Sequence, residues 1–215
     1  MNRLTVVDNF YNNPKEILSI ANFSPGGCGG QFTERTKPLH EIDPNLHNEF
    51  SNFICSVLNI DPKRVFVFSY LNKQTFDHSN DGMIHVDGRN SVTGEYSNFH
   101  SYKQLIGGMI FLSEDVDWES GVGLYDDITT RSDEEKFNFA IRSLYEKKND
   151  FKLGKISKQE FDSLTEQYNS NFKMTCFVSN TFNRMVAWKC GYPHKTILKE
   201  TQKELFSHNF YISIV

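Results

Sequence analysis

The chain has 215 residues, of which 38% are hydrophobic and 14% aromatic, so it is long enough to form one domain with a substantial core. The formal net charge of −4 argues against nucleic acid as a partner, because no basic face can dominate the surface. Residues 1–10 lack the apolar run of a signal peptide, and no stretch approaches the length of a membrane span. We therefore expect a cytoplasmic protein that binds no membrane.

The N-terminal part is predicted to contain a short strand, Leu4–Val7, followed by two helices. The first helix begins at Asn13-Pro14, because Asn is a good N-cap residue and Pro is tolerated at the first helical position. The second begins in the same way at Asp43-Pro44. Its apolar stripe is expected to be buried and comprises Leu46, Phe50, Phe53, Ile54, Val57 and Leu58. Between the two helices, the glycine-rich segment Ser24–Gly30 predicts a loop.

From Arg64 onward the pattern changes to strands. Residues 65–71 are β-branched and aromatic throughout, which is typical of a strand covered on both faces. Further strands are predicted at 83–87, 104–113, 121–125, 173–179, 184–189 and 205–215. Within one of them, Gly107-Gly108 indicates a bulge or a close approach by a ligand or another backbone. Many evenly spaced strands with few long helices predict a mainly β domain, a jelly roll or a related sandwich closed on itself.

A helical hairpin is predicted between Thr129 and Asn171, inserted between strands of the β domain. Its first helix starts near Ser132 with acidic residues and ends at Lys147-Lys148, which matches the helix dipole at both ends. A capping box at Ser157–Glu160 begins its second helix. The insertion fits four roles: a lid, a substrate clamp, a contact in a homodimer, or a structural cap on the sheet.

Two separated segments carry the residues of a candidate metal site. His85 and Asp87 lie two residues apart on an extended segment, so both side chains leave the same face. Far downstream, His194 follows the apolar strand at 184–189. Two histidines and one carboxylate, with other coordination positions open, suit non-haem Fe(II) and its O₂ chemistry. We therefore predict that His85, Asp87 and His194 bind one iron, with His194 on the sheet opposite the other two. His78 with Asp81 is a rival pair, but it lies in a polar loop.

In its layout the chain resembles the 2-oxoglutarate- and Fe(II)-dependent dioxygenases, particularly the prolyl-hydroxylase-like branch. The segments that carry the resemblance follow the family's order and are residues 7–11, 69–72, 84–88, 107–112, 121–125, 183–188 and 193–194. The resemblance covers most of the chain outside the helical insertion. It implies one domain spanning residues 1–215, a mainly β double-stranded β-helix with flanking helices. The N-terminal helices within 14–58 would pack on the barrel, with the helical insertion at about 130–171.

The resemblance also implies the cofactors. Fe(II) would be bound by the three residues named above, with O₂ and 2-oxoglutarate as co-substrates. Tyr70 stands where a tyrosine of this branch commonly contacts 2-oxoglutarate. The family has an Arg or Lys nine or ten residues after the second histidine, and Lys203 stands nine residues after His194. Alignment on the last strand would place Leu205 there instead. The candidates to bind the distal carboxylate are therefore Lys203, His208 and Lys189.

The predicted function is an oxygenase that hydroxylates a C–H bond of a small-molecule or peptidyl substrate and releases succinate and CO₂. Tyr125, Trp188 and Arg89 are candidates to line the substrate side, and a structural role is the alternative for the two aromatic residues. Two other function classes fit the same strand pattern. One is a β-sandwich binding or structural module without iron, and the other is a cupin-like metalloenzyme that does not use 2-oxoglutarate.

Overall fold

The computed structural model describes residues 4–25, 33–75, 84–85, 104–115, 117–129, 147, 150–151, 153–199 and 204–214. The strands among them are β1 (Leu4–Val7), β2 (Ser24–Pro25), β3 (Thr33–Arg35), β4 (Val65–Thr75), β5 (Gln104–Phe111), β6 (Gly121–Asp127), β7 (Phe172–Ser179), β8 (Met185–Lys189), β9 (His194–Ile197) and β10 (Glu204–Ile214). The helices are α1 (Pro14–Ser19), α2 (Leu39–Ile42), α3 (Pro44–Val57), the 3-10 helix η1 (Pro62–Arg64) and α6 (Lys158–Asn169).

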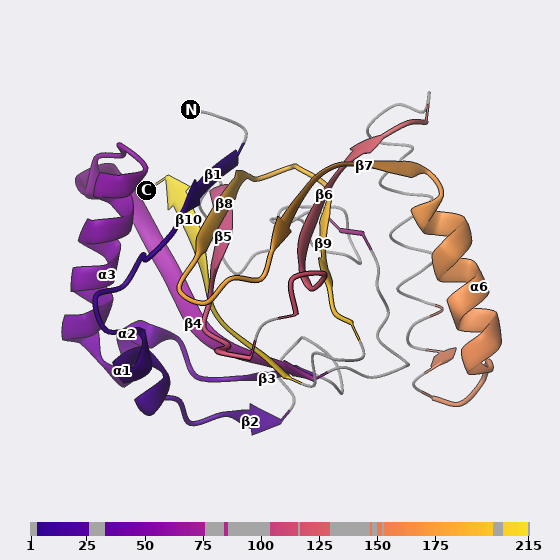
Figure 1. Ribbon diagram of the computed structural model, residues 1–215, viewed down its shortest axis with the longest axis horizontal. Coiled ribbons are helices and arrows are strands. Elements are labelled where there is room, and N and C mark those ends of the chain that lie inside the picture. Colours follow the sequence, from indigo (N-terminus) through magenta and orange to yellow (C-terminus); the bar gives the residue numbers. More distant parts are fainter. Residues whose placement is uncertain are drawn as a thin grey trace.

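The strands form two antiparallel sheets that lie face to face (Figure 1). The large sheet has the order β1-β8-β5-β10-β4-β3-β2, and the small sheet has the order β7-β6-β9. Between them lies an apolar layer that includes Met109 and Phe111 from β5 and Val122 and Leu124 from β6. Each sheet buries one face in this layer, which is the arrangement of a jelly roll. The prediction of a mainly β double-stranded β-helix is therefore confirmed.

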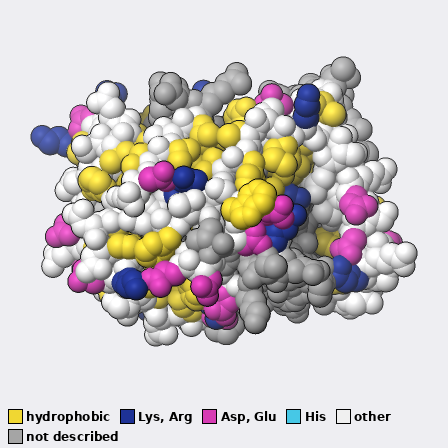
Figure 2. Space-filling model, in the orientation of Figure 1, with side chains coloured by type: hydrophobic (Ala, Val, Ile, Leu, Met, Phe, Trp, Pro, Cys, Tyr) yellow, Lys and Arg dark blue, Asp and Glu magenta, His cyan; other side chains and the backbone are white. Residues whose placement is uncertain are grey.

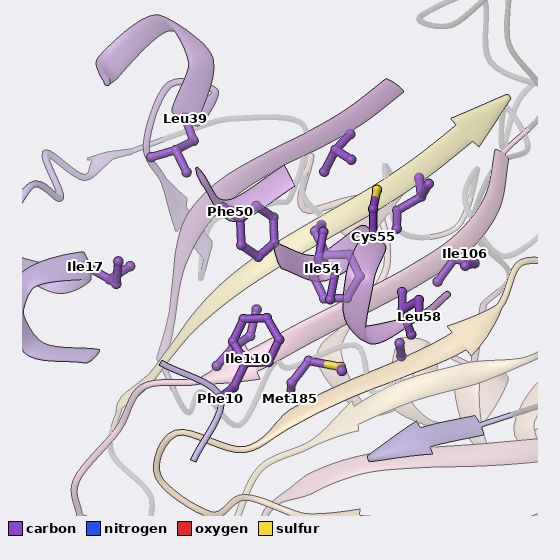
Figure 3. Close-up of a cluster of buried hydrophobic side chains, with 14 of the residues drawn as sticks. Phe10, Ile17, Leu39, Phe50, Ile54, Cys55, Leu58, Ile106, Ile110 and Met185 are labelled. Carbon is purple, nitrogen blue, oxygen red and sulfur yellow. The ribbon is translucent and has the colours of Figure 1, made fainter. Parts of the chain in front are cut away.

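The N-terminal helices cover the outer face of the large sheet. Figure 3 shows Phe50 and Ile54 of α3 beside Ile110 of β5, and Ile106 of the same strand belongs to the same apolar cluster. The start of α3 is as predicted, because the Asp43 carboxylate accepts a hydrogen bond from the Leu46 backbone N–H at 3.0 Å. Two details of the helix predictions were wrong. Phe53 is 46% exposed instead of buried, and the Asn13 side chain makes no capping hydrogen bond to α1.

Side chains alternate between the two faces of the large sheet along β10 and β4, and this alternation decides which of them face the small sheet. Phe206, Phe210 and Ile212 pack in the helical cluster, whereas Leu205 packs in the layer between the sheets. Odd-numbered residues of β10 therefore face the small sheet. Their partners on β4 share that face, and the pairs are Ser207 with Asn72, Asn209 with Tyr70, and Tyr211 with Phe68.

Helix α6 covers the other side of the small sheet, away from the large one (Figure 1). Ser157 caps it as predicted, because its hydroxyl oxygen accepts from the Glu160 backbone N–H at 3.1 Å. Phe161 and Tyr168 of α6 pack against Ile84 and Tyr125. The first predicted helix of the insertion, from Ser132 to Lys148, falls almost entirely outside the described residues.

Residues 190–193 carry the chain from the large sheet to the small one. Gly191 has a φ of +89°, which a residue without a Cβ adopts readily, and a turn follows β8 there. The chain then enters β9, which the sequence analysis did not predict. It also missed α2, β2 and β3, which are all four residues or shorter.

The surface mixes charges of both signs. Figure 2 shows Lys and Arg side chains lying among Asp and Glu on one face, with hydrophobic side chains between them. Single large hydrophobic residues are exposed, such as Trp118 at 72%. None of the helices within the described residues is both long and apolar enough to cross a membrane.

Gly108 on β5 is required by close packing. A Cβ built at this position would overlap the Phe210 ring and lie 2.7 Å from the Val186 carbonyl oxygen. The close approach expected at Gly107-Gly108 is thus made by a side chain and a strand backbone. Because Phe210 is fully buried and cannot move aside, Gly108→Ala is expected to lower the free energy of unfolding by about 2 kcal/mol in urea denaturation. In the double variant with Phe210→Leu the two losses should be less than additive, and additive losses would contradict this explanation.

Candidate functional site

His85 and His194 form a cross-strand pair at the edge of the small sheet. The His85 backbone N–H donates to the His194 carbonyl at 2.9 Å, and the His194 N–H donates to the His85 carbonyl at 2.8 Å. Directly opposed residues of an antiparallel pair project from the same face. The ring centroids are 4.4 Å apart. The two predicted histidines are therefore brought together, although the expectation that they come from opposite sheets was wrong.

Both rings lie on the side of the small sheet that faces the large sheet. His194 is paired with Leu124 of β6, which is buried in the layer between the sheets. Its side chain is 4% exposed, and the Trp188 ring of the large sheet lies 4.5 Å away, centroid to centroid. Ile84 packs on the opposite face against α6, so alternation directs His85 inward as well.

The imidazole of His194 is oriented by its own loop. Its Nδ1 lies 2.9 Å from the Tyr192 carbonyl oxygen. A carbonyl oxygen can only accept, so Nδ1 carries the proton in this contact and the neutral ring has its lone pair on Nε2. A backbone carbonyl that fixes the tautomer in this way is typical of histidines that bind metals.

Two predicted site residues, Asp87 and Lys203, lie outside the described residues. Within the part of the chain that is described, no group of three His, Cys, Asp or Glu side chains could hold a metal ion. The two histidines thus form the described part of the predicted triad.

Polar side chains line the face of the large sheet that looks toward the small one. Tyr70 is 5% exposed, and its hydroxyl lies 3.4 Å from that of Tyr211 on β10. The Ser207 hydroxyl donates to the Asn209 side-chain oxygen at 2.7 Å. Asn72, next to this pair, is also buried. This buried wall of hydroxyl and amide groups is suited to a polar ligand. Burying the same groups against purely apolar side chains would cost free energy.

Three buried polar atoms on this wall have no hydrogen-bond partner among the described residues: Trp188 Nε1, Asn72 Oδ1 and Arg35 Nε. Arg35 belongs to β3 and pairs with Asn72, so it shares the face of that residue. Unsatisfied buried groups cost free energy, and they commonly mark a place for water, an ion or a ligand. These atoms on the large sheet could therefore bind a small polar molecule, and one of them, Trp188 Nε1, belongs to the ring that lies 4.5 Å from that of His194.

The other residues proposed for the carboxylate or the substrate face away from this space. His208 is fully buried on the helical side, where its Nδ1 contacts the Tyr11 hydroxyl and its ring lies 4.4 Å from that of Phe50. Lys189 is paired with Ile106, which faces the helices, and it is exposed. Tyr125 packs against α6. His208, Lys189 and Tyr125 are thus excluded from these roles, and Arg89 lies outside the described residues.

No protein-family model matches the sequence, and no curated protein matches it either. Solved structures do match. HygX from Streptomyces hygroscopicus, determined with nickel and 2-oxoglutarate bound, superposes with a TM-score of 0.57 at 15% identity, covering 99% of this chain and 83% of HygX. A prolyl-4-hydroxylase from Pseudomonas putida gives 0.54 at 7% identity, with 100% and 94% covered. An oxidoreductase of the 2OG-Fe(II) oxygenase family from Burkholderia pseudomallei gives 0.55 at 11%, with 98% and 85% covered. The chain therefore shares the fold of the 2-oxoglutarate- and Fe(II)-dependent oxygenases.

Proposed function

We propose that the protein is an Fe(II)- and 2-oxoglutarate-dependent oxygenase whose metal is bound by His85, Asp87 and His194. The observation that carries the proposal is the pair of inward-facing imidazoles, one of them held by the Tyr192 carbonyl with Nδ1 protonated. Asp87 is two residues after His85, the spacing that returns a side chain to the same face of an extended segment. Imidazole and carboxylate ligands suit divalent iron.

The wall of the large sheet would bind the oxo acid. Tyr70 offers a hydroxyl on the face of the large sheet that looks toward the small one, and Trp188 offers an indole N–H without a partner among the described residues. Lys203 is the residue that the sequence predicts for the distal carboxylate. When bound, Fe(II) and 2-oxoglutarate supply oxidative chemistry that releases succinate and CO₂ and hydroxylates a C–H bond of a small-molecule or peptidyl substrate.

The surrounding chain would keep the two histidines in place and the site dry. Met109, Phe111 and Val186 are apolar side chains between the sheets, and they would exclude water from the site. Helix α6 holds the residue before His85, because the Asn169 side-chain oxygen accepts from the Ile84 backbone N–H at 3.2 Å. This contact favours a structural role for the second helix of the insertion.

Anaerobic titration of the purified protein with Fe(II) and 2-oxoglutarate tests the proposal. We expect a weak visible charge-transfer band, and, after O₂ is admitted, succinate formed without an added substrate. His47→Gln is the matched control, since His47 lies on α3, which packs on the outer side of the large sheet, and the change should leave both signals unchanged. Absence of the band together with absence of metal binding would refute the proposal and favour a binding module. Metal binding without the band would favour a different metalloenzyme.

A further inference from the structure

Arg35 is a cation on the face of the large sheet that carries Asn72 and Tyr70, with no counter-ion among the described residues. Its guanidinium carbon lies 4.8 Å from the centroid of the Tyr70 ring, and its Nε is buried without a hydrogen-bond partner in the part of the chain that the structure describes. The side chain makes no ion pair with any residue of the described ranges. Glu34, the adjacent carboxylate, belongs to the opposite face of β3 and lies near Lys73.

This arrangement is suited to an anionic ligand. The guanidinium is half-buried and makes no ion pair with a described residue, so most of its five donors remain for another partner. Its planar fork matches a carboxylate, and stacking on Tyr70 fixes the plane of the fork in advance. Asn72, directly opposite on β4, adds an amide at the same level of the wall.

Strand β10 supplies no competing cation. The residues of β10 that face the small sheet are Leu205, Ser207, Asn209, Tyr211 and Ser213, and none of them is basic. Leu205, where the resemblance would place the basic residue, is 1% exposed in the apolar layer. Among the residues of β3, β4 and β10 that face the small sheet, Arg35 is therefore the one cation available to a ligand carboxylate.

We propose that Arg35 binds the carboxylate of the oxo acid that lies away from the metal, and that it makes the site specific for dicarboxylic 2-oxo acids. The inference rests on the proposed function, and it assigns the anchoring role to a strand outside the last strand of the barrel. Lys203, predicted from the sequence, is the competitor that the experiment must separate from Arg35.

The test compares two ligands of equal chain length, 2-oxoglutarate and 2-oxopentanoate, which lacks the distal carboxylate. Their Kd values are measured by calorimetry on Mn(II)-loaded protein, a readout that needs no turnover. The wild type is expected to bind 2-oxoglutarate about 50-fold more tightly than 2-oxopentanoate. Arg35→Ala should reduce this preference to about threefold or less with little change for 2-oxopentanoate. Arg35→Lys should keep an intermediate preference, because an ammonium binds carboxylate as a point charge.

Arg64→Ala is the matched control, since Arg64 is an exposed arginine at the end of η1. Arg35→Gln provides a second variant of similar length if the alanine variant is poorly folded by circular dichroism. An unchanged preference in the Arg35 variants, or a preference lost in Lys203→Ala alone, would overturn the assignment while leaving the proposed function intact. Failure of the wild type to bind 2-oxoglutarate at all would instead overturn the proposed function.

Discussion

Replacement of His194 by alanine is expected to lower the affinity for Fe(II) by at least about 100-fold and to remove the charge-transfer band of the 2-oxoglutarate complex. Loss of a residue that only orients a metal ligand already costs about 10- to 100-fold in affinity, and His194 is itself a proposed ligand. The variant also loses the contact of Nδ1 with the Tyr192 carbonyl, which orients the ring. Metal content after anaerobic loading and dialysis measures the effect directly, and succinate formation provides a second readout.

His85→Ala should behave like His194→Ala, because the two rings form one cross-strand pair. Asp87→Asn should retain more metal than Asp87→Ala, since an amide oxygen is still a weak ligand. Thermal unfolding of each variant separates loss of metal from loss of fold. Normal Fe(II) content in a folded His194→Ala protein would exclude this residue as a ligand and would leave the two imidazoles as a packing feature.

Acidification from pH 7.5 to pH 5.0 is expected to lower the free energy of unfolding by about 2 kcal/mol through His208. Burial, reinforced by the nearby charge of His47, lowers the pKa of His208 to about 3. The unfolded chain has a histidine pKa of about 6.5 and so binds the proton more readily than the folded one. Stability is therefore complete above about pH 6.5 and is lost as the pH falls toward 3, reaching about 5 kcal/mol in the limit.

Urea denaturation of wild type and His208→Leu at the two pH values checks this assignment. The leucine variant should be less stable at pH 7.5, because the Tyr11 hydroxyl loses its partner, but its stability should fall much less on acidification. His47 contributes in the same direction, since burial and the neighbouring His40 lower its pKa as well. His47→Gln therefore measures how much of the remaining pH dependence of the free energy of unfolding comes from His47. The pKa of Asp8 is lowered by its hydrogen bond to Arg184, so the stabilisation from this pair is kept between pH 7.5 and 5.0 and is lost only below about pH 4. A wild-type slope retained in His208→Leu would contradict the assignment.

The sequence predicts the elements whose local pattern is strong. Helix α3 has an Asp-Pro start and an apolar stripe, and β4 and β10 are long runs of β-branched and aromatic residues. The two histidines could be selected because His-x-Asp on a strand and a histidine after an apolar strand are local signals. That the two histidines are adjacent could not be predicted, since His194 reaches His85 only through a turn at Gly191 and the four-residue strand β9.

Arg35 carried no detectable signal in the sequence. It lies on a three-residue strand after a glycine-rich segment, and its importance depends on the register that places it opposite Asn72. Register is a property of strand pairing and is not encoded in a window of three residues. His208 was a candidate anchor for the same reason. Only the alternation of side chains along β10 in the paired sheet shows that it faces the helices.

His85 and His194 lie at the small sheet and Arg35 lies in the large one, and the apolar layer of Met109, Phe111, Val122 and Leu124 separates the two sheets. The thickness of this layer sets the span between the point where an oxo acid is coordinated and the point where its tail is held. The side-chain volumes at these four positions would therefore determine the length of the oxo acid that can span the site. Divergence in that layer would change which oxo acid fits, while each half of the site kept its own chemistry.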